Sequence, residues 1–316
     1  MFVDGLYNQH MPDARAARAI SKAVEFLLAS RNGDGGWGYA HGRLSTAEPT
    51  AYSLLGLSEA LPKADFQKVL EKGTAWFEAH TGAAGAISSG QRGATDAALV
   101  DNWGTMLALY SLRRLSAGAE LTARYIKYLQ GSSGNRIDRK TSQDLNLNGD
   151  LLAWSWARGT ASWVEPTAYA LLAMKASGLA GSERVKSGEA FLIDRACYEG
   201  GWNYGNKEVL KVRLEPMPTN TCFALLALQD LDRKNETINR AVDYLQKELS
   251  QHQSALFLSL GTLCFDIYGA PYEKAVAQLI DRQEADGSWR GNVHLTSLAL
   301  CALNLAGGRR NVFKLS

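Results

Sequence analysis

The chain has 316 residues, of which 46% are hydrophobic and 21% charged, and its formal net charge is +2. Such a composition builds a soluble globular protein with a full core. The balanced charge, without a run of basic residues, excludes the surface that nucleic-acid binding requires. Four scattered cysteines indicate reduced thiols rather than disulfides. Because no targeting or bilayer-spanning segment is visible, we expect a cytoplasmic protein.

The first predicted helix, residues 21–30, runs into the glycine-rich loop 32–37, which ends at Trp37. This loop lacks the alternating oxygen ligands of a calcium loop and the Gly-Lys pair of a phosphate-binding loop. The same helix and loop recur at residues 188–202 and 274–289. The helix alone recurs at residues 72–77, 124–129 and 240–245. Six copies of one unit therefore make up the chain.

A second helical pattern follows each copy and begins near a threonine or serine. These patterns cover residues 49–57, 104–112, 166–174, 220–228, 253–260 and 295–303. They are apolar nearly all round, which predicts buried helices, whereas the first helices carry charges on one side and should cover them from outside. We predict one domain over residues 1–316. Its six repeats lie approximately at residues 16–62, 66–116, 119–180, 183–232, 236–269 and 271–308.

Twelve helices in six pairs fit either an open solenoid or a closed ring. A solenoid keeps a regular repeat length and needs polar caps at its ends. The aromatic anchors of the outer helices are unevenly spaced here, and the loops differ greatly in length. This irregularity favours the closed ring, an all-α (α/α)6 toroid of six helix pairs.

The segment from Lys274 to Trp289 places a basic residue, a small residue, an aliphatic residue, a glutamine, a glycine and a tryptophan at fixed intervals. This pattern resembles the QW motif of the prenyltransferase and squalene-cyclase repeat family. The copy from Lys22 resembles it too, except that Arg31 replaces the glutamine, and Gln278 departs from the motif at its aromatic position. The resemblance covers nearly the whole chain. It implies an α/α toroid whose inner helices surround a central apolar cavity for an isoprenoid chain.

Neither catalytic set of the family is complete in this sequence. In terpenoid cyclases an Asp-x-Asp-Asp motif supplies the acid, but Met217, Thr219 and Asn220 occupy those positions here. In protein prenyltransferases an Asp-x-Cys pair and a histidine bind zinc. The corresponding residues here are Asn220, Cys222 and, with a one-residue shift, His294, and a neutral asparagine is a poor zinc ligand. We therefore expect no metal or other cofactor, and no protein prenylation.

The starts of the inner helices offer replacement acids. Aligned on their threonines, the helices carry Glu48, Trp103, Glu165, Thr219 and His294 at the position of the central cyclase aspartate. Glu48 and Glu165 are the best candidates, with Asp101 and His294 next. Burial would keep such a carboxyl protonated, whereas the positive end of the helix dipole would oppose this. The alternative is that both glutamates only accept backbone N–H groups and that His294 is a core histidine.

The densest aromatic stretch, residues 154–165, precedes Glu165. Aromatic faces stabilise cations, so a carbocation cavity would be lined with them. The candidate ligand-contacting residues are Trp103, Trp154, Trp156, Trp163, Tyr52, Tyr169, Phe223 and the polar Asn220. Packing between repeats is the alternative role for the aromatic residues, and it is the role we expect for Trp37, Trp202 and Trp289.

The polar insert at residues 130–150 could be a lid over one mouth of the ring or a solvated loop. Together these features predict an isoprenoid or terpenoid cyclase-like protein that acts on, or holds, a polyprenyl-type chain in an aromatic-lined cavity. Its possible reaction is an acid-initiated cyclisation. The alternative is a non-catalytic toroid that binds a lipid or a protein. An apolar small molecule is the expected partner, with peripheral membrane contact and a protein partner left open.

Overall fold

The computed structural model describes residues 14–88, 101–231 and 235–315. Most of these residues are helical. The outer helices are α1 (Ala14–Ala29), α3 (Lys63–Ala79), α5 (Ala119–Gly131), α8 (Glu183–Asp194), α10 (Glu236–Glu248) and α12 (Glu273–Ile280). The inner helices are α2 (Ala47–Ala60), α4 (Asn102–Arg114), α7 (Val164–Ala176), α9 (Pro218–Ala227), α11 (Ala255–Tyr268) and α13 (Val293–Ala306). Outside the pairs lie α6 (Arg139–Asp144) and a hairpin of β1 (Glu208–Val209) and β2 (Val212–Arg213).

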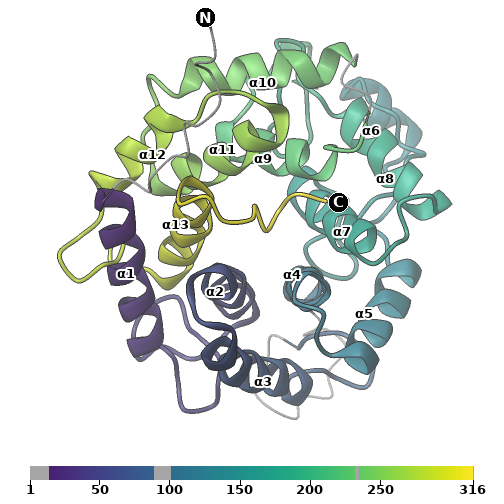
Figure 1. Ribbon diagram of the computed structural model, residues 1–316. Helices are drawn as coiled ribbons and strands as arrows, with labels where there is room; N and C mark the ends of the chain where they lie inside the picture. Colours follow the sequence, from purple (N-terminus) through teal and green to yellow (C-terminus); the bar gives the residue numbers. More distant parts are fainter. Residues whose placement is uncertain (1–13, 89–100, 232–234, 316) are drawn as a thin grey trace, which may run out of the picture.

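The six pairs form a closed ring. Each inner helix packs against the next, and α13 returns to pack against α2, as Figure 1 shows. Contacts between the first and last repeats fix this closure. The Val293 N–H donates to the Tyr39 carbonyl at 2.9 Å, and Gln283 Nε2 donates to the Ala19 carbonyl at 2.8 Å. The predicted all-α toroid is therefore confirmed, because an open solenoid would leave the two end repeats apart.

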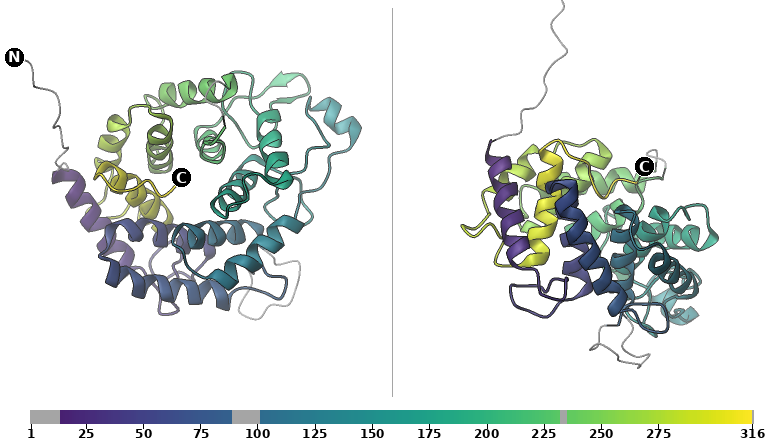
Figure 2. Two further views of the ribbon diagram at one scale, coloured as in Figure 1. Left: turned by 45° about the vertical axis from the view of Figure 1, so that its right-hand side comes forward. Right: turned by 60° about the horizontal axis from the view of Figure 1, so that its bottom comes forward.

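The C-terminal segment crosses the ring where the inner helices end (Figures 1 and 2). Phe313 is fully buried, and its ring stacks on Tyr110 with centroids 5.5 Å apart. The Tyr110 hydroxyl donates to the Val312 carbonyl at 2.9 Å, and Gln229 Nε2 donates to the Phe313 carbonyl at 2.9 Å. The C-terminal segment thus covers the ring at the end where the inner helices finish.

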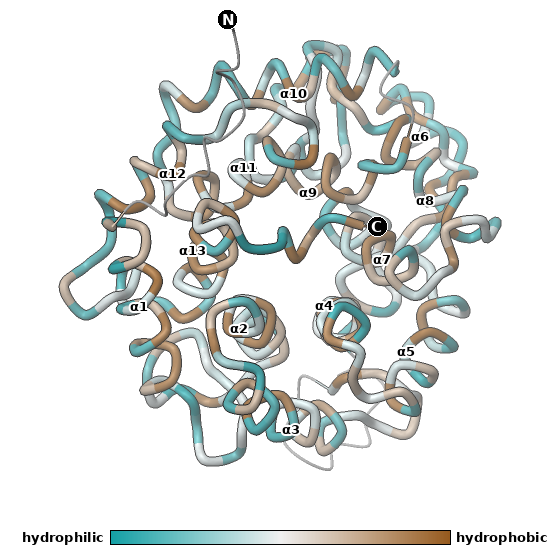
Figure 3. The backbone as a smooth tube through the Cα atoms, in the orientation of Figure 1, coloured by the Kyte–Doolittle hydropathy of each residue, from teal (hydrophilic) through white to brown (hydrophobic). Residues whose placement is uncertain are grey.

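Burial separates the two layers as the pattern predicted. In α7 every residue from Pro166 to Lys175 is buried, whereas α10 buries only Ile238, Ala241 and Leu245. Figure 3 shows apolar residues recurring along the inner helices, while polar residues lie on the outer circumference. A helix that is apolar all round is stable only when other helices surround it and bury its surface. The outer layer supplies that cover.

A buried threonine hydroxyl fixes the loop before five of the six inner helices. The hydroxyls of Thr50, Thr105, Thr167, Thr221 and Thr296 accept, in that order, the backbone N–H groups of Trp37, Ile87, Trp154, Trp202 and Trp289, at 2.8–3.2 Å. All five threonines are fully buried. Each bond satisfies a loop N–H that water cannot reach, and leaving such a group unpaired costs about 1–3 kcal/mol.

The motif tryptophans make a second fixed contact. The indole N–H groups of Trp37, Trp202 and Trp289 donate to the carbonyls of Leu27, Leu192 and Leu279 at 2.7, 2.6 and 2.9 Å. Each acceptor lies ten residues earlier, in the last turns of the outer helix, where carbonyls lack partners within the helix. The predicted packing role of these three tryptophans is confirmed. Each tryptophan ties the end of an outer helix to the inner helix that follows.

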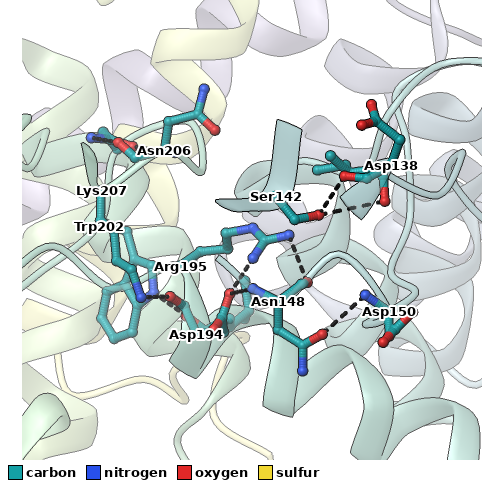
Figure 4. Close-up of polar contacts among 12 residues, drawn as sticks. Asp138, Ser142, Asn148, Asp150, Asp194, Arg195, Trp202, Asn206 and Lys207 are labelled. Carbon is teal, nitrogen blue, oxygen red and sulfur yellow. Dashed lines mark hydrogen bonds and ion pairs between the residues drawn. The ribbon is translucent and has the colours of Figure 1, made fainter. Parts of the chain in front are cut away.

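The insert at residues 130–150 contains α6 and lies at the outer edge of the ring beside α8 (Figures 1 and 4). The Asn148 N–H donates to Asp194 Oδ2 at 3.1 Å, and Arg195 Nη2 donates to the Asn148 carbonyl at 3.3 Å. Asp194 also pairs with Arg195. These contacts fasten the insert to the end of α8, and a covering role over the mouth remains a prediction.

Two further sequence features can be placed within the described ranges. The four cysteines are buried and free, as predicted for small apolar side chains. None of the described helices combines the length and apolar character needed to cross a bilayer. The expected cytoplasmic location stays a prediction.

Replacing Thr221 by valine should destabilise the protein by about 1–3 kcal/mol, because the buried Trp202 N–H loses its acceptor while the volume is conserved. Urea denaturation measures the change in the free energy of unfolding. Thr262→Val is the matched control, since the equally buried Thr262 hydroxyl donates to the Leu258 carbonyl of its own helix and has no other hydrogen bond within the described ranges. Equal losses in the two variants would contradict the role assigned to the loop contact.

Candidate functional site

Four ionisable side chains gather where the inner helices begin, at the end of the ring opposite the C-terminal segment. Glu48 and Glu165 lie in the first turns of α2 and α7, Asp101 precedes α4, and His294 is the second residue of α13. The negative charge of Glu48 acts on the other two carboxyls and on the imidazole. The structure thus brings together the four acids and bases that the sequence singled out, and their role in a site stays a prediction.

Two aromatic side chains lie beside Glu48. The Tyr39 hydroxyl donates to Glu48 Oε2, and His294 Nε2 lies 3.7 Å from Glu48 Oε1. Burial lowers the pKa of His294, although the charge of Glu48 opposes the shift, so the imidazole is neutral at pH 7. Burial and then Glu48 raise the pKa of Tyr39, which keeps its hydroxyl a donor.

Tyr39 is a site residue that the sequence did not reveal. It lies in the loop after Trp37, where no periodicity marks it. Its backbone is fixed by the bond to Val293 that closes the ring, and Ala40 pairs with Asn292 next to it. Only the closure of the ring brings Tyr39 to Glu48 and to His294, whose ring centroid lies 6.2 Å from that of Tyr39.

Glu165 differs from Glu48 because its carboxyl makes no hydrogen bond or ion pair with any residue that the structure describes. Burial raises the pKa of Glu165 from 4.5 to about 8, and the charge of Glu48 adds to this shift. Desolvation and a nearby like charge both disfavour the carboxylate. The Glu165 carboxyl is therefore mainly protonated at neutral pH.

The alternative role for the two glutamates was to accept a backbone N–H at the start of a helix. Among the described residues it is Asp101 that has this role. Asp101 Oδ1 accepts the Gly104 N–H at 2.9 Å. Burial raises the pKa of Asp101, and this hydrogen bond opposes the shift. A side chain at Gly104 would collide with Asp101 Oδ2, since a Cβ there would lie only 2.6 Å away. Asp101 thus has a structural task that Glu48 and Glu165 lack within the described residues.

Aromatic side chains form a continuous cluster beside these acids. The Trp103 ring lies 4.4 Å from that of Trp156 and meets Tyr169 edge to face at 4.5 Å. Tyr169 also contacts Phe223, with centroids 4.9 Å apart. Such separations are those of favourable aromatic pairs. The structure therefore brings together residues from α4, the loop before α7, α7 itself and α9.

Tyr52 and Tyr169 close the interior beneath the acids. Their hydroxyls hydrogen-bond to each other, although α4 separates their helices in the ring, so the pair spans the centre. Both side chains are at most 1% exposed. Phe313 packs against the Tyr52 ring from the C-terminal segment, with centroids 6.3 Å apart. Aromatic side chains thus cross the centre at this level, below the starts of the inner helices.

A pocket of about 710 Å³ lies at the starts of α7 and α9. Trp156 and Trp163 line it together with Tyr204, Leu214 and Met217, and the polar Asn203, Asn206 and Glu215 complete its wall. The Val164 N–H donates to the Tyr204 carbonyl at 3.0 Å, which fixes this wall of the pocket to the start of α7, one residue before Glu165. Tyr204, Leu214 and Met217 were not predicted, because they lie in an irregular segment.

Trp154 occupies a packing position. It is fully buried, and its indole N–H donates to the Leu129 carbonyl at 2.9 Å, the contact that Trp37, Trp202 and Trp289 make. Arg184 lies over its ring, 3.5 Å from the centroid. We therefore leave Trp154 out of the residues proposed to contact a ligand. Asn220 is also buried, and its Nδ2 has no hydrogen-bond partner among the described residues.

The comparisons with known proteins concern the fold. No family model matches the sequence, so the QW-repeat family is not confirmed, and no curated protein matches it. Many solved structures are similar. The type II terpene cyclase MstE from Scytonema, without ligand, is 17% identical, with a TM-score of 0.62, over 93% of this chain and 98% of that chain. The likeness shows the α/α toroid fold.

Two further structures show how broadly this toroid is used. A variant of MstE in complex with geranylgeranyl dihydroxybenzoate is 15% identical, with a TM-score of 0.63, over 93% of this chain and 98% of that chain. An alpha-1,6-mannanase from Salegentibacter is 11% identical, with a TM-score of 0.60, over 93% of this chain and 99% of that chain. Because these enzymes differ in chemistry, function must be argued from the site.

The raised pKa of Glu165 makes stability depend on pH. The native state holds this proton more tightly than the unfolded chain, so its contribution is complete below pH 4.5 and is lost as the pH rises through about 8. At pH 9 we expect Glu165→Gln to be more stable than the native protein by about 1–3 kcal/mol, an amount reduced because the carboxyl is partly exposed.

Thermal unfolding at pH 5 and pH 9 measures this difference. Each kcal/mol corresponds to about 1–2 °C in Tm for a chain of this size. Glu183→Gln, an exposed glutamate in the first turn of α8, is the matched control and should behave alike at both values of pH. A gain for Glu165→Gln that is equal at pH 5 and pH 9 would show that the carboxyl is not buried as a neutral acid.

Proposed function

We propose that this protein is an isoprenoid cyclase-like enzyme in which the Glu165 carboxyl acts as a general acid. The observation that carries the proposal is the placement of Glu165: its carboxyl has no partner among the described residues, burial raises its pKa to about 8, and it lies beside the aromatic cluster at the starts of the inner helices. An acid that protonates an alkene or an epoxide must hold its proton at the working pH. Glu165 meets that requirement.

The aromatic cluster suits the cation that such a protonation would create. Once Glu165 delivers its proton, positive charge develops on the substrate carbon while the carboxylate gains a negative charge. The faces of Trp103, Trp156 and Tyr169 can stabilise a cation by roughly 0.5–2 kcal/mol each. The negative charge of Glu48 acts on the same region and would favour the cation further.

The depth of the site limits the substrate. The Tyr52–Tyr169 pair spans the ring below the acids, so a long chain cannot thread through the centre at this level. An apolar chain can instead lie along the pocket formed by Trp156, Trp163 and Tyr204. Cyclisation would then concern the end of the chain that reaches Glu165. The geranylgeranyl compound bound by the MstE variant supports this class of substrate.

A non-catalytic toroid that binds a lipid or a protein is the alternative. It is supported by the residues at the position of the cyclase acid motif, where Met217, Thr219 and Asn220 stand in place of aspartates. In that case the pocket would hold an apolar ligand without converting it. The two functions share the pocket and differ in whether the Glu165 proton is used.

Glycoside cleavage is a second catalytic candidate. A protonated acid paired with a second carboxyl group is the arrangement that glycosidases need. Glu165 and Glu48 provide such a pair here, and a mannanase shares the toroid. Incubation with α-1,6-linked mannose oligosaccharides, followed by analysis of released sugars, tests this candidate.

The main experiment incubates the protein with geranylgeranyl dihydroxybenzoate, geranylgeranyl diphosphate and squalene, and identifies products by mass spectrometry. We expect a cyclic product whose rate of formation falls above pH 8, as Glu165 loses its proton. Glu165→Gln should reduce the rate by at least about 100-fold, the usual contribution of a general acid. The exposed Glu183→Gln should leave the rate unchanged.

Co-purified lipids, identified in the same preparation, separate the remaining outcomes. Bound isoprenoid without any cyclic product, equal in the native protein and Glu165→Gln, would establish the binding function and refute the catalytic one. A cyclic product formed equally by Glu165→Gln would place the acid elsewhere. Release of sugars from the oligosaccharides alone would favour glycoside cleavage.

A further inference from the structure

A second pocket, of about 750 Å³, lies between the second and third repeats, outside the aromatic cluster. Arg124, Lys127 and Tyr128 of α5 form one side of it, and Arg158, from the loop before α7, forms another. The buried Asn102, the first residue of α4, also lines it. We call this pocket the basic groove.

The basic groove carries three positive charges and, among the residues described as lining it, no carboxylate. Arg124 Nη2 makes a single contact, to the Gly82 carbonyl at 3.3 Å. Lys127 and Arg158 make no hydrogen bond or ion pair with the described part of the chain. Elsewhere on the surface several exposed arginines are paired, as Arg15 is with Asp281. Three cations that have no ion-pair partner among the described residues surround one concavity, and they create a positive potential that an anion would offset.

The three cations line the same groove from two separate segments of the chain. Burial raises the pKa of Tyr128, the positive charge of Arg158 opposes this shift, and the more weakly acting charge of Asp101 adds to it, so Arg158 lies within electrostatic reach of the α5 side chain. Lys127 is one residue from Tyr128 on the same helix. Glycine and serine residues make up much of the remaining wall. Their small side chains leave room for a group with several oxygen atoms.

The basic groove shares a wall with the aromatic cluster. Asn102 lines the groove, and the next residue, Trp103, contacts Trp156 at 4.4 Å. Arg158 follows Trp156 by two residues. Hydrogen bonds keep the wall in place: the Tyr128 hydroxyl donates to Asn102 Oδ1 at 2.5 Å, and Asn102 Nδ2 donates to the Ser155 carbonyl at 3.1 Å. One molecule with an apolar chain and an anionic end could therefore contact both regions.

We propose that the basic groove binds a phosphate-type oxyanion, such as a diphosphate, carried by the isoprenoid substrate. Binding of the anion rests on the groove alone, whereas its attachment to the substrate rests on the proposed function. Arginine guanidinium groups match phosphate oxygens in pairs, and the lysine adds a mobile point charge. Three cations suit a multiply charged group better than a single carboxylate. The phosphate could belong to a soluble molecule or to a lipid headgroup.

Calorimetric titration with inorganic pyrophosphate tests the groove directly. We expect the native protein to bind pyrophosphate and the double variant Lys127→Gln/Arg158→Gln to bind it at least tenfold more weakly. The control, Arg18→Gln/Lys63→Gln, removes the same charge from exposed positions on α1 and α3 and should match the native affinity within twofold. Circular dichroism confirms that each variant is folded.

Cosedimentation with phosphatidic acid vesicles, against phosphatidylcholine vesicles, distinguishes the two sources of phosphate. Binding of pyrophosphate alone indicates a soluble ligand, and binding of phosphatidic acid vesicles that the groove variant loses indicates a headgroup. Absence of both, or equal binding by native protein and groove variant, overturns the proposal. If pyrophosphate binds in the groove but no isoprenoid is cyclised, the proposed function fails while the anion site stands.

Discussion

The hydrogen bond from a loop N–H to the buried threonine of the inner helix is the contact on which this ring depends. It recurs in five repeats with nearly the same length, although the loops that it fixes differ greatly in size. Because the loop N–H is shielded from water, breaking this hydrogen bond would leave it unpaired, and this cost keeps the loop in place. The position two residues before each threonine is thereby held at the mouth of the ring. Glu48, Glu165 and His294 occupy that position in three repeats.

Three carboxyl groups at the starts of the inner helices lie in three different environments. Asp101 accepts a backbone N–H, Glu48 accepts the Tyr39 hydroxyl, and Glu165 has neither kind of partner in the described structure. A buried carboxyl without a donor is stable only when it keeps its proton. The difference between Glu165 and its neighbours thus follows from hydrogen bonding and not from residue type. It also sets a carboxyl of raised pKa beside the charged Glu48.

Much of this arrangement was predictable from the sequence, because it depends on local periodicity. The helix pairs, the toroid and the packing of Trp37, Trp202 and Trp289 follow from the repeat. Trp154 was harder to assign. Its acceptor, Leu129, lies 25 residues earlier instead of ten, because the insert separates the tryptophan from its helix. The spacing that identified the other three was therefore absent.

Contacts between distant segments could not be predicted. Tyr39 reaches Glu48 only through closure of the ring, and Phe313 reaches Tyr52 only because the chain returns across the ends of the inner helices. The basic groove likewise joins α5 to a loop about 30 residues later in the sequence. In each case the residue itself can be seen in the sequence, whereas its contact forms only in the tertiary fold.

The central claim is that Glu165 is protonated at neutral pH, and infrared difference spectroscopy tests it most directly. Spectra of the native protein minus Glu165→Gln, recorded from pH 5 to pH 10, isolate the carbonyl stretch of the protonated carboxyl. We predict that this band is present at pH 7 and disappears with a midpoint near pH 8. A band already lost by pH 6 would mean that Glu165 is an ordinary carboxylate, and the account of the site as an acid would be wrong.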